Sequence, residues 1–222
     1  MSDQVIISLK NVKASHRKKQ VLNGVNLEVK KGEFVYIIGK TGSGKSSLLK
    51  ILYKEVEIES GEGKILDFAL GKMKSKMIAQ LRRALGIVFQ DFQLLPDRSV
   101  EDNLLFVMKS TGWKSKKLMK KQVDDTLSQV GLSESKDKFP HQMSGGEQQR
   151  VVIARAMINS PKVILADEPT GNLDPESSKE IMNILTEIAK TGTAVLMATH
   201  DMAIVKDYPS RTLLCEDGIL TE

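Results

Sequence analysis

The stretch Gly39-Lys40-Thr41-Gly42-Ser43-Gly44-Lys45-Ser46 decides the fold, because it has the form G-x-x-x-x-G-K-[ST] of a phosphate-binding loop. The apolar run 34–38 before it suits a buried parallel strand, and 46–52 after it has helical spacing. Glycines in such a loop let backbone N–H groups turn inward around an anion, and the helix N-terminus adds its dipole. The sequence therefore predicts a nucleoside triphosphate site that extends to Ser47, in preference to a glycine-rich hairpin with an incidental lysine.

Two side chains of this loop have expected roles of their own. Lys45 is expected to reach the β- and γ-phosphates as a point charge, and the Ser46 hydroxyl is expected to ligate Mg²⁺. A nucleoside triphosphate and Mg²⁺ are therefore the predicted ligands of the loop.

Composition limits the class of protein. A chain of 222 residues with 27% charged and 41% hydrophobic residues suits one globular unit, and it has no apolar run of the ~18 residues that a membrane span needs. The single Cys215 excludes an internal disulfide framework, and the start of the chain lacks a secretory signal pattern, so we expect a cytoplasmic protein.

The net charge is +5, and lysines gather at 17–19, 72–76 and 114–121. These clusters allow a nucleic-acid or anionic-membrane surface, but solvated helix faces explain them more simply, since no aromatic residues interleave with them. No nucleic-acid partner is expected.

The remaining periodicities predict the elements around the loop. Residues 5–29 read as antiparallel strands that a turn at 30–33 connects to the loop strand, 64–66 could continue that sheet, and 86–89 reads as a short strand that ends at Gln90. From 91 to 140 the pattern is helical: Met119, Val123, Leu127 and Val130 form one apolar face, and Gly131 closes the helix. We read 91–140 as an inserted helical subdomain.

A new helix is expected to begin after Ser144. Ser144 and Glu147 form the S-x-x-E pattern of a capping box, which explains both residues without a ligand. Gly145 and Gly146 are unexplained by it, because two glycines in a first helical turn are unfavourable by roughly 1 kcal/mol each relative to alanine. Close approach of a ligand to the backbone would account for them, and an anion suits bare N–H groups at a helix start.

Two further strands end in polar residues. The apolar run 163–166 leads into Asp167 and Glu168, and the run 193–199, read as the last parallel strand, leads into His200. Parallel sheets place their sites at the carboxyl ends of strands, so these side chains should lie beside the phosphate loop. One carboxylate could then serve Mg²⁺ while the other faces the attacking water, and His200 could contact the γ-phosphate. The simpler alternative for the two carboxylates is an acidic strand cap.

Together these stretches resemble the ABC-type ATP-binding subunits, over nearly the entire chain. In that family's terms 39–46 is similar to the Walker A motif, Gln90 to the Q-loop glutamine, 144–148 to the signature, 163–167 to Walker B, Glu168 to the catalytic carboxylate, Asp174 to the D-loop aspartate and His200 to the switch histidine. The resemblance implies an α/β P-loop NTPase with a RecA-like core. That core and an antiparallel β subdomain would comprise 1–90 and 141–222, with the helical subdomain at 91–140.

The resemblance also implies function. Glu168, His200 and Gln90 would be catalytic, with Ser46, Gln90 and Asp167 at the metal. Two copies would dimerise on ATP, each phosphate loop facing the other's Ser144, Gly145, Gly146 and Glu147. Asp174 would also contact the nucleotide. The dimer would drive a separate integral membrane permease from the cytoplasmic face of the inner membrane. The runs 89–100, 144–150 and 196–201 are most similar to cell-division ATPases, and lipoprotein-release or macrolide-efflux ATPases are the alternative.

Two other classes with this cassette fit less well. DNA-repair and chromosome ATPases carry a long coiled coil or zinc modules where this chain has about 50 residues and one cysteine. Ribosome-associated factors normally have two cassettes in one chain, whereas this sequence has one phosphate loop.

The sequence departs from the family pattern at the adenine platform. An aromatic residue usually precedes the second strand, but this chain has Ala14-Ser15-His16-Arg17 there. His16 is therefore the expected platform for the base, with Arg17 or the backbone as alternatives.

Related transporters hold a short helix of the permease beside the Q-loop. Here the stretch reads Gln90-Asp91-Phe92-Gln93-Leu94-Leu95-Pro96, and its apolar side chains at 92, 94 and 95 share a face if the segment is extended. They are expected to dock the partner; alternatively they pack beneath the helical subdomain.

Overall fold

A computed structural model describes residues 4–16 and 19–222. Its centre is a six-stranded sheet in the order β10-β9-β3-β8-β7-β6. The five strands from β9 to β6 run parallel, and β10 pairs antiparallel with β9. The bounds of these strands are β3 Phe34–Ile38, β6 Leu85–Val88, β7 Val163–Asp167, β8 Ala194–Thr199, β9 Arg211–Glu216 and β10 Ile219–Thr221.

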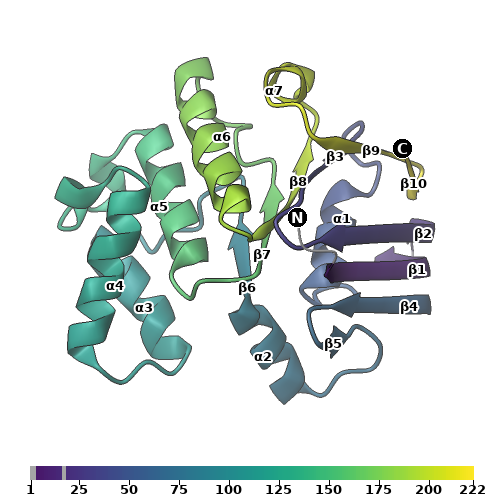
Figure 1. Ribbon diagram of the computed structural model, residues 1–222, viewed down its shortest axis with the longest axis horizontal. Helices are drawn as coiled ribbons and strands as arrows, with labels where there is room; N and C mark the ends of the chain where they lie inside the picture. Colours follow the sequence, from purple (N-terminus) through teal and green to yellow (C-terminus); the bar gives the residue numbers. More distant parts are fainter. Residues whose placement is uncertain (1–3, 17–18) are drawn as a thin grey trace.

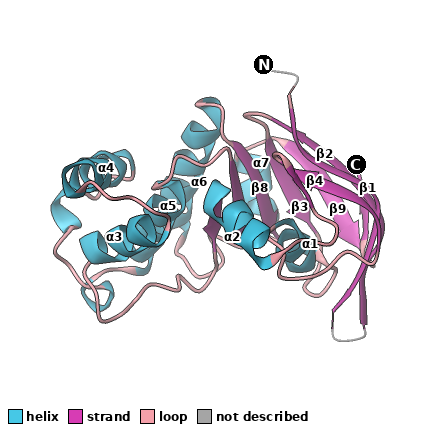
Figure 2. Ribbon diagram, turned by 90° about the horizontal axis from the view of Figure 1, so that it is seen from below, coloured by secondary structure: helices cyan, strands magenta, loops and turns pink. Residues whose placement is uncertain are grey.

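A second, antiparallel sheet packs on one face of the first. It has the order β2-β1-β4-β5, with the bounds β1 Val5–His16, β2 Lys19–Lys30, β4 Ser60–Ile65 and β5 Phe68–Ala69. Helix α1 (Lys45–Leu52) lies between the two sheets, and Figure 2 shows the resulting layers. The predicted antiparallel sheet at 5–29 and its continuation at 64–66 are therefore present, although Leu66 lies just outside β4.

Helices α5 (Gly145–Met157) and α6 (Pro175–Lys190) pack on the other face of the central sheet, as Figure 1 shows. Helices α3 (Val100–Ser110) and α4 (Lys116–Gln129) pack on α5, farther from the sheet. Helices α2 (Ser75–Ala84) and α7 (Met202–Asp207) lie at the margins, with short 3-10 turns at Ser133–Ser135 and Pro140–Gln142. Helix α4 follows the predicted periodicity and ends next to Gly131, whose φ of 69° only glycine adopts easily.

Alternation along the parallel strands explains the two cores. In β7, Val163 and Leu165 join the core toward α1 and the second sheet, whereas Ile164 and Ala166 join the core toward α5 and α6. The residues of α3 and α4 share that second core, since Leu104 and Met119 belong to the same cluster as Ile164.

The structure corrects three details of the sequence reading. Residues 91–99 are not helical, because the first helix of this region begins only at Val100, with Ser99 as its N-cap. The run at 194–199 is not the last parallel strand, since β9 also pairs parallel with β3. The stretch at 92–95 is not extended, because Phe92 and Gln93 both have a φ of 51° and turn the chain.

Candidate functional site

The phosphate loop joins β3 to α1, as predicted. Gly39, Gly42 and Gly44 have φ values of 146°, 84° and 117°, a region that other residues avoid. Crowding adds to this requirement at two of them, because a Cβ at Gly39 would clash with the carbonyl of Cys215 and one at Gly44 would lie 2.7 Å from the carbonyl of Val21. The loop therefore packs closely against the end of β9, which contains Cys215, and against β2, which contains Val21.

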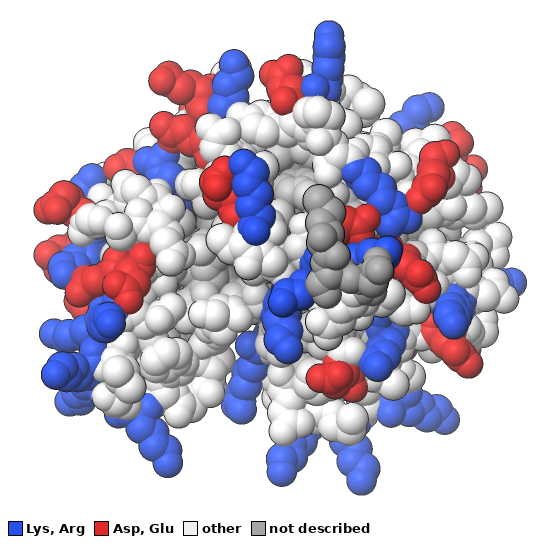
Figure 3. Space-filling view, in the orientation of Figure 1, with Lys and Arg blue, Asp and Glu red and all other residues white. Residues whose placement is uncertain are grey.

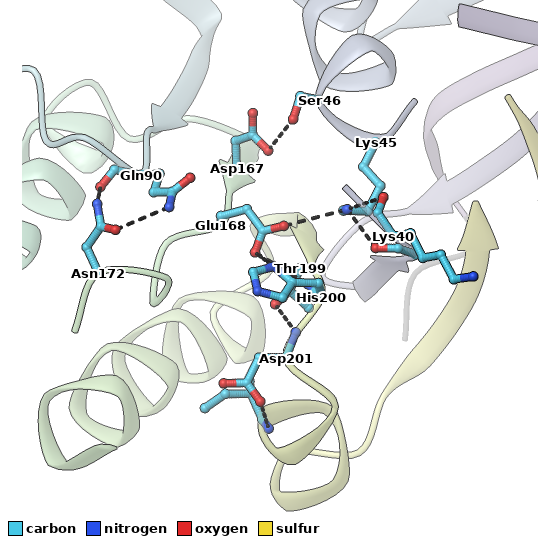
Figure 4. A network of polar contacts seen from close by, with 12 residues as sticks. Lys40, Lys45, Ser46, Gln90, Asp167, Glu168, Asn172, Thr199, His200 and Asp201 are labelled. Atoms are coloured by element: carbon cyan, nitrogen blue, oxygen red, sulfur yellow. Dashed lines mark hydrogen bonds and ion pairs between the residues drawn. The ribbon is translucent and has the colours of Figure 1, made fainter. Parts of the chain in front are cut away.

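Lys45 is buried, and its ammonium group lies against the backbone at the start of the loop. It donates hydrogen bonds to the carbonyls of Gly39 at 2.8 Å and Lys40 at 3.2 Å, and lies 3.6 Å from a carboxylate oxygen of Glu168. Figure 4 shows Lys45 and Glu168 facing one another from α1 and from the end of β7. The structure thus brings the loop lysine and the predicted catalytic carboxylate together.

Ser46 and Asp167 form the second contact between the same two elements. The Ser46 hydroxyl donates to Asp167 Oδ1 at 2.9 Å. Burial raises the pKa of the Asp167 carboxyl, and the Ser46 hydrogen bond opposes that rise. A hydroxyl and a carboxylate side by side are the oxygen ligands that Mg²⁺ takes when water and phosphate complete its shell.

The wider donor set is consistent with such an ion. Within the described part of the chain there is no group of three or more His, Cys, Asp or Glu side chains that could hold a metal. A zinc-type cage is therefore absent from those residues, whereas the Ser46–Asp167 pair fits Mg²⁺. In the loop itself, the Ser43 hydroxyl is buried without a hydrogen-bond partner, as expected of a donor that faces a phosphate.

Glu168 also binds His200, the residue that follows β8. Its Oε2 lies 2.8 Å from His200 Nδ1 and accepts from the His200 backbone N–H at 3.3 Å. The φ of Glu168 is 49°, an unfavourable value for this residue type of the kind that is found at functional sites. The Glu168 backbone N–H donates to the Ala198 carbonyl, so the backbone hydrogen bonds between β7 and β8 continue as far as Glu168.

The residue after the histidine has a structural role. Asp201 caps α7, because its Oδ1 accepts from the backbone N–H groups of Ala203 at 2.9 Å and Ile204 at 3.2 Å. The cap fixes the chain just beyond His200 and so limits where the imidazole can lie.

Gln90 does not join this cluster. Its side-chain amide donates to Asn172 Oδ1 at 3.3 Å, and the Asn172 side-chain amide donates to the Gln90 backbone carbonyl at 3.2 Å. Figure 4 shows this pair apart from the hydrogen bond between Ser46 and Asp167. Among the described residues Gln90 thus hydrogen-bonds to Asn172 and not to Ser46 or Asp167, and its metal and catalytic roles stay predictions.

Helix α5 begins with the predicted capping box. The Ser144 hydroxyl accepts from the Glu147 N–H at 3.2 Å, and Glu147 Oε2 accepts from the Ser144 N–H at 2.8 Å. The hydrogen bond from the Ser144 backbone lowers the pKa of the Glu147 carboxyl, and Lys138 lowers it further. Both residues are thus explained within the chain.

Gly146 also has a reason within the chain, which the sequence reading missed. A Cβ there would lie 2.5 Å from Ser177 Oγ and 2.9 Å from Ser177 Cβ, so only glycine lets α5 approach the first turn of α6. At Gly145 a Cβ would be 3.5 Å from its nearest neighbour, a side-chain carbon of Leu173. A partner's nucleotide is therefore not needed to explain Gly146.

Asp174 is the N-cap of α6. Its carboxylate accepts from the backbone N–H groups of Glu176 at 3.1 Å and Ser177 at 3.0 Å. The hydrogen bonds with Ser177 are the main cause of the lowered pKa of Asp174. This cap accounts for an aspartate here, and contact with nucleotide remains a prediction.

A cavity of about 460 Å³ opens beside the loop. It lies between the hairpin and the C-terminal turn, and its lining comprises Lys19, Gln20, Val21, Gly42, Ser43, Gly44, Lys45, Ser46, Ser47, Asp217 and Gly218. His16 is exposed at the end of β1 and paired with Lys19, so its stacking on a base stays a prediction. Arg17, the alternative, lies outside the described residues.

Lys40 and Thr41 are on the other side of the loop. With Gly39 and His200 they line a second cavity, of about 540 Å³, which Cys215 also borders. Cys215, the single cysteine of the chain, has a structural position here. Its Sγ lies 3.3 Å from the Ser43 carbonyl, and burial raises the pKa of its thiol. No sequence signal marks this supporting position, because it depends on the placement of β9.

No helix within residues 4–16 and 19–222 has the length and apolar character of a membrane span.

Comparison with known proteins agrees with this geometry. The family model described as ABC transporter matches residues 22–171. The cell division ATP-binding protein FtsE of Streptococcus pneumoniae serotype 2 (strain D39) is 47% identical over 89% of this chain and 85% of its own. The lipoprotein-releasing system ATP-binding protein LolD of Aquifex aeolicus is 42% identical over 96% and 95%.

A solved structure extends the comparison. The ATP-binding cassette MJ0796, in a dimeric post-hydrolysis state bound to ADP and Pi, superposes with a TM-score of 0.86 at 33% identity, covering 97% of each chain. The predicted fold class and activity class are confirmed by these relationships. The chain belongs to the ABC transporter family, as one of its ATP-hydrolysing cassettes.

Proposed function

We propose that this cassette hydrolyses ATP at the carboxyl edge of the parallel sheet, with Glu168 as the group that orients the attacking water. The observation that carries the proposal is the position of the Glu168 carboxylate, between the Lys45 ammonium at 3.6 Å and His200 Nδ1 at 2.8 Å. A carboxylate held between a phosphate-loop cation and an imidazole can accept a proton from water while its neighbours bind the phosphate.

The residues around Glu168 would bind the phosphates and the metal ion. Lys45 and the backbone N–H groups of 39–46 would bind the phosphates, while Ser46 and Asp167 would hold Mg²⁺. When bound, the ion neutralises charge on the phosphate oxygens. His200 holds one carboxylate oxygen of Glu168 and is 58% exposed at its side chain, so its ring can also meet a ligand that enters the site.

The biological role is proposed from the relatives. We infer the role of FtsE in cell division, in which two copies of the cassette close on ATP and act on an FtsX-like integral membrane permease that regulates cell-wall hydrolases. The cassette would then lie on the cytoplasmic face of the inner membrane, bound to that permease. The 47% identity to the pneumococcal FtsE supports this role.

One alternative within the family has its own support. The 42% identity to LolD favours a cassette of a lipoprotein-release complex, to which macrolide-efflux ATPases are similar in their signature run. The two roles share the ATP site and differ in the membrane partner. The identity of that partner is therefore the deciding observation.

The test is capture of the cassette from native membranes, in mild detergent, with a tag at its exposed C-terminus. The proposal expects an FtsX-like permease as the main co-purifying membrane protein. Recovery of a lipoprotein-release or efflux permease would replace this role with the alternative. A Glu168→Gln cassette purified in the same way gives a matched preparation in which ATP holds the dimer closed.

We further propose where the permease docks. A cavity of about 350 Å³ lies between α2 and α3, lined by Arg82, Arg83, Leu85, Ile87, Phe89, Gln93, Val107, Ser110, Thr111, Arg155, Ala156 and Asn159. Gln93 and Phe89 belong to the stretch around the Q-loop, so a helix seated here would border Gln90. Helices α3 and α4 would form the moving subdomain of 91–140.

The apolar stretch itself faces inward more than expected. Phe92 and Leu94 are partly buried against the second core, and the Phe92 carbonyl accepts from the Arg155 guanidinium at 2.8 Å. Internal packing, the alternative considered above, therefore accounts for Phe92 and Leu94.

A further inference from the structure

Basic residues of this chain gather on two segments that contain no acidic residue. Segment 71–84, which includes α2, has five lysines and arginines, and segment 109–121, which connects α3 to the first half of α4, has six lysines. The chain as a whole has a net charge of +5, so the remainder of it is net acidic. This uneven distribution of charge is typical of a surface that binds an anionic partner.

The two segments flank one cavity. The proposed docking cavity is lined by Arg82 and Arg83 from the first segment and by Ser110 and Thr111 from the second. Figure 3 shows Lys and Arg side chains gathered along the lower edge of the molecule, where α2 and α4 lie in Figure 1. Figure 2, seen from below, has α2 and the α3–α4 region toward the viewer. The basic segments therefore border a common face.

The lysines on this face form no ion pairs within the part of the chain that the structure describes. Every lysine of the second segment is exposed, and none of them forms an ion pair with another described residue; the same holds for Lys72, Lys74 and Lys76. Acidic residues of α4 begin only at Asp124, which pairs with Lys136. Within residues 4–16 and 19–222, therefore, no ion pair compensates the charge of these lysines.

Each segment also exposes one large apolar side chain among its lysines. Leu118 is 57% exposed between Lys117 and Lys120, and Met77 is 41% exposed next to Lys76. An apolar side chain surrounded by mobile ammonium groups is typical of surfaces that lie on lipid, where lysines meet headgroups and the apolar group enters the boundary.

We propose that this basic face, defined as residues 71–84 and 109–121, binds the anionic lipid surface of the membrane directly, on both sides of the permease docking cavity. Lysines rather than arginines dominate it, and they are unconstrained, which suits a diffuse layer of headgroups better than an acidic peptide recognised by fixed bidentate pairs. The inference goes beyond the proposed ATPase role, because it needs neither nucleotide nor a particular permease.

The test is sedimentation of the purified full chain with protein-free vesicles, either phosphatidylglycerol and phosphatidylcholine in equal parts or phosphatidylcholine alone. The proposal expects binding to the anionic vesicles only, weakening as salt is added. Neutralising Lys116, Lys117 and Lys120 to Gln should lower the partition coefficient about 5-fold per lysine, roughly 100-fold in total. Leu118→Ser should lower it several-fold at unchanged charge.

A matched triple variant supplies the control. Lys13, Lys179 and Lys206 are exposed lysines outside the basic face, and changing them to Gln alters the net charge equally. This control should bind as the unchanged protein does, and both triples should keep their ATPase activity. If both triple variants lose vesicle binding equally, net charge alone explains the effect and the proposal is overturned. Absence of binding to anionic vesicles would overturn it too, and would leave an acidic protein segment as the occupant of the face.

Discussion

Asp167 lies where burial and function oppose each other. Its carboxyl group ends β7 beside Ser46, and burial raises its pKa, so the ionised form is less stable there than in water. Metal binding needs the ionised form. The ionised Asp167 carboxylate therefore lowers the free energy of unfolding, as is common for ligand-binding residues.

This opposition predicts a pH-dependent stability change in Asp167→Asn. Because the folded-state pKa is raised, the folded protein binds more protons than the unfolded chain in the window between the two values, and the free energy of unfolding falls as pH rises through it. Asparagine lacks this penalty. We expect the variant to melt about 1–4 °C higher than the unchanged protein at pH 7.5, without nucleotide or Mg²⁺, and the difference to vanish below about pH 4.

The exposed Asp125 gives a control for that measurement. Asp125→Asn makes the same chemical change on the surface of α4 and should leave the melting temperature nearly unchanged at both pH values. A melting difference for Asp167→Asn that stays constant from pH 4 to pH 8 would contradict the burial account.

At the scale of elements, the approach of α5 to α6 depends on one glycine of a pair. Gly146 faces Ser177 in the first turn of α6, whereas a methyl group at 145 would make only ordinary van der Waals contacts, with Leu173 at 3.5 Å. The two adjacent positions therefore separate a packing requirement from a ligand requirement.

We predict that Gly146→Ala and Gly145→Ala differ in stability. A methyl at 146 would force α5 and α6 apart, and overpacking of this kind costs about 1–3 kcal/mol. At 145, alanine should be neutral or stabilise by up to about 1 kcal/mol, because it favours the helix. Urea denaturation without nucleotide measures both, and Ser177→Gly should restore part of the loss in Gly146→Ala. Equal stability of the two alanine variants would show that packing does not require Gly146.

Elements with strong local signals were predictable from the sequence. The phosphate-loop strand, the apolar face of α4 and the capping box at Ser144 depend on residues close together in the chain, and the structure has each of them. Helix α2 gave no comparable signal, since Leu81 is its single buried residue and its lysines resembled a solvated stretch. Strand β9 was missed because its pairing with β3 connects residues far apart in sequence.

The site was predictable to a similar degree. Motif order placed Lys45, Ser46, Asp167, Glu168 and His200 together, since parallel strands meet at one edge. The reciprocal bonds of Gln90 with Asn172, and the packing at Gly146, arise from contacts between segments that no local pattern specifies.

At the scale of the whole molecule, the ATP site and the proposed docking cavity are connected through the chain between β6 and α3. The cavity includes Phe89 and Gln93, which flank Gln90, and the Gln90–Asn172 bonds tie this segment to the loop after Glu168. A partner helix in the cavity could therefore sense the state of the catalytic edge.

Ser110→Arg tests the docking cavity. Ser110 is exposed at the end of α3, and among the described residues its hydroxyl donates only to the Phe106 carbonyl. A long side chain at 110 should therefore fill the cavity without disturbing the core. We expect the variant to lose at least tenfold in co-purification of the permease while its isolated ATPase activity stays within a few-fold. Ser128→Arg on the exposed side of α4 is the matched control. If Ser110→Arg retains the permease as the control does, docking lies elsewhere.

The whole account depends on ATP hydrolysis at Glu168, and the turnover of Glu168→Gln tests it most directly. The amide keeps the shape of the side chain but cannot accept the proton, so turnover should fall roughly 10²–10⁴-fold. ATP affinity should stay within a few-fold, since Lys45, Ser46 and Asp167 bind the phosphates and metal, and ATP-bound dimers should accumulate. Glu134→Gln, on the exposed surface, should hydrolyse ATP normally. Hydrolysis by Glu168→Gln at the rate of the unchanged protein would contradict the account.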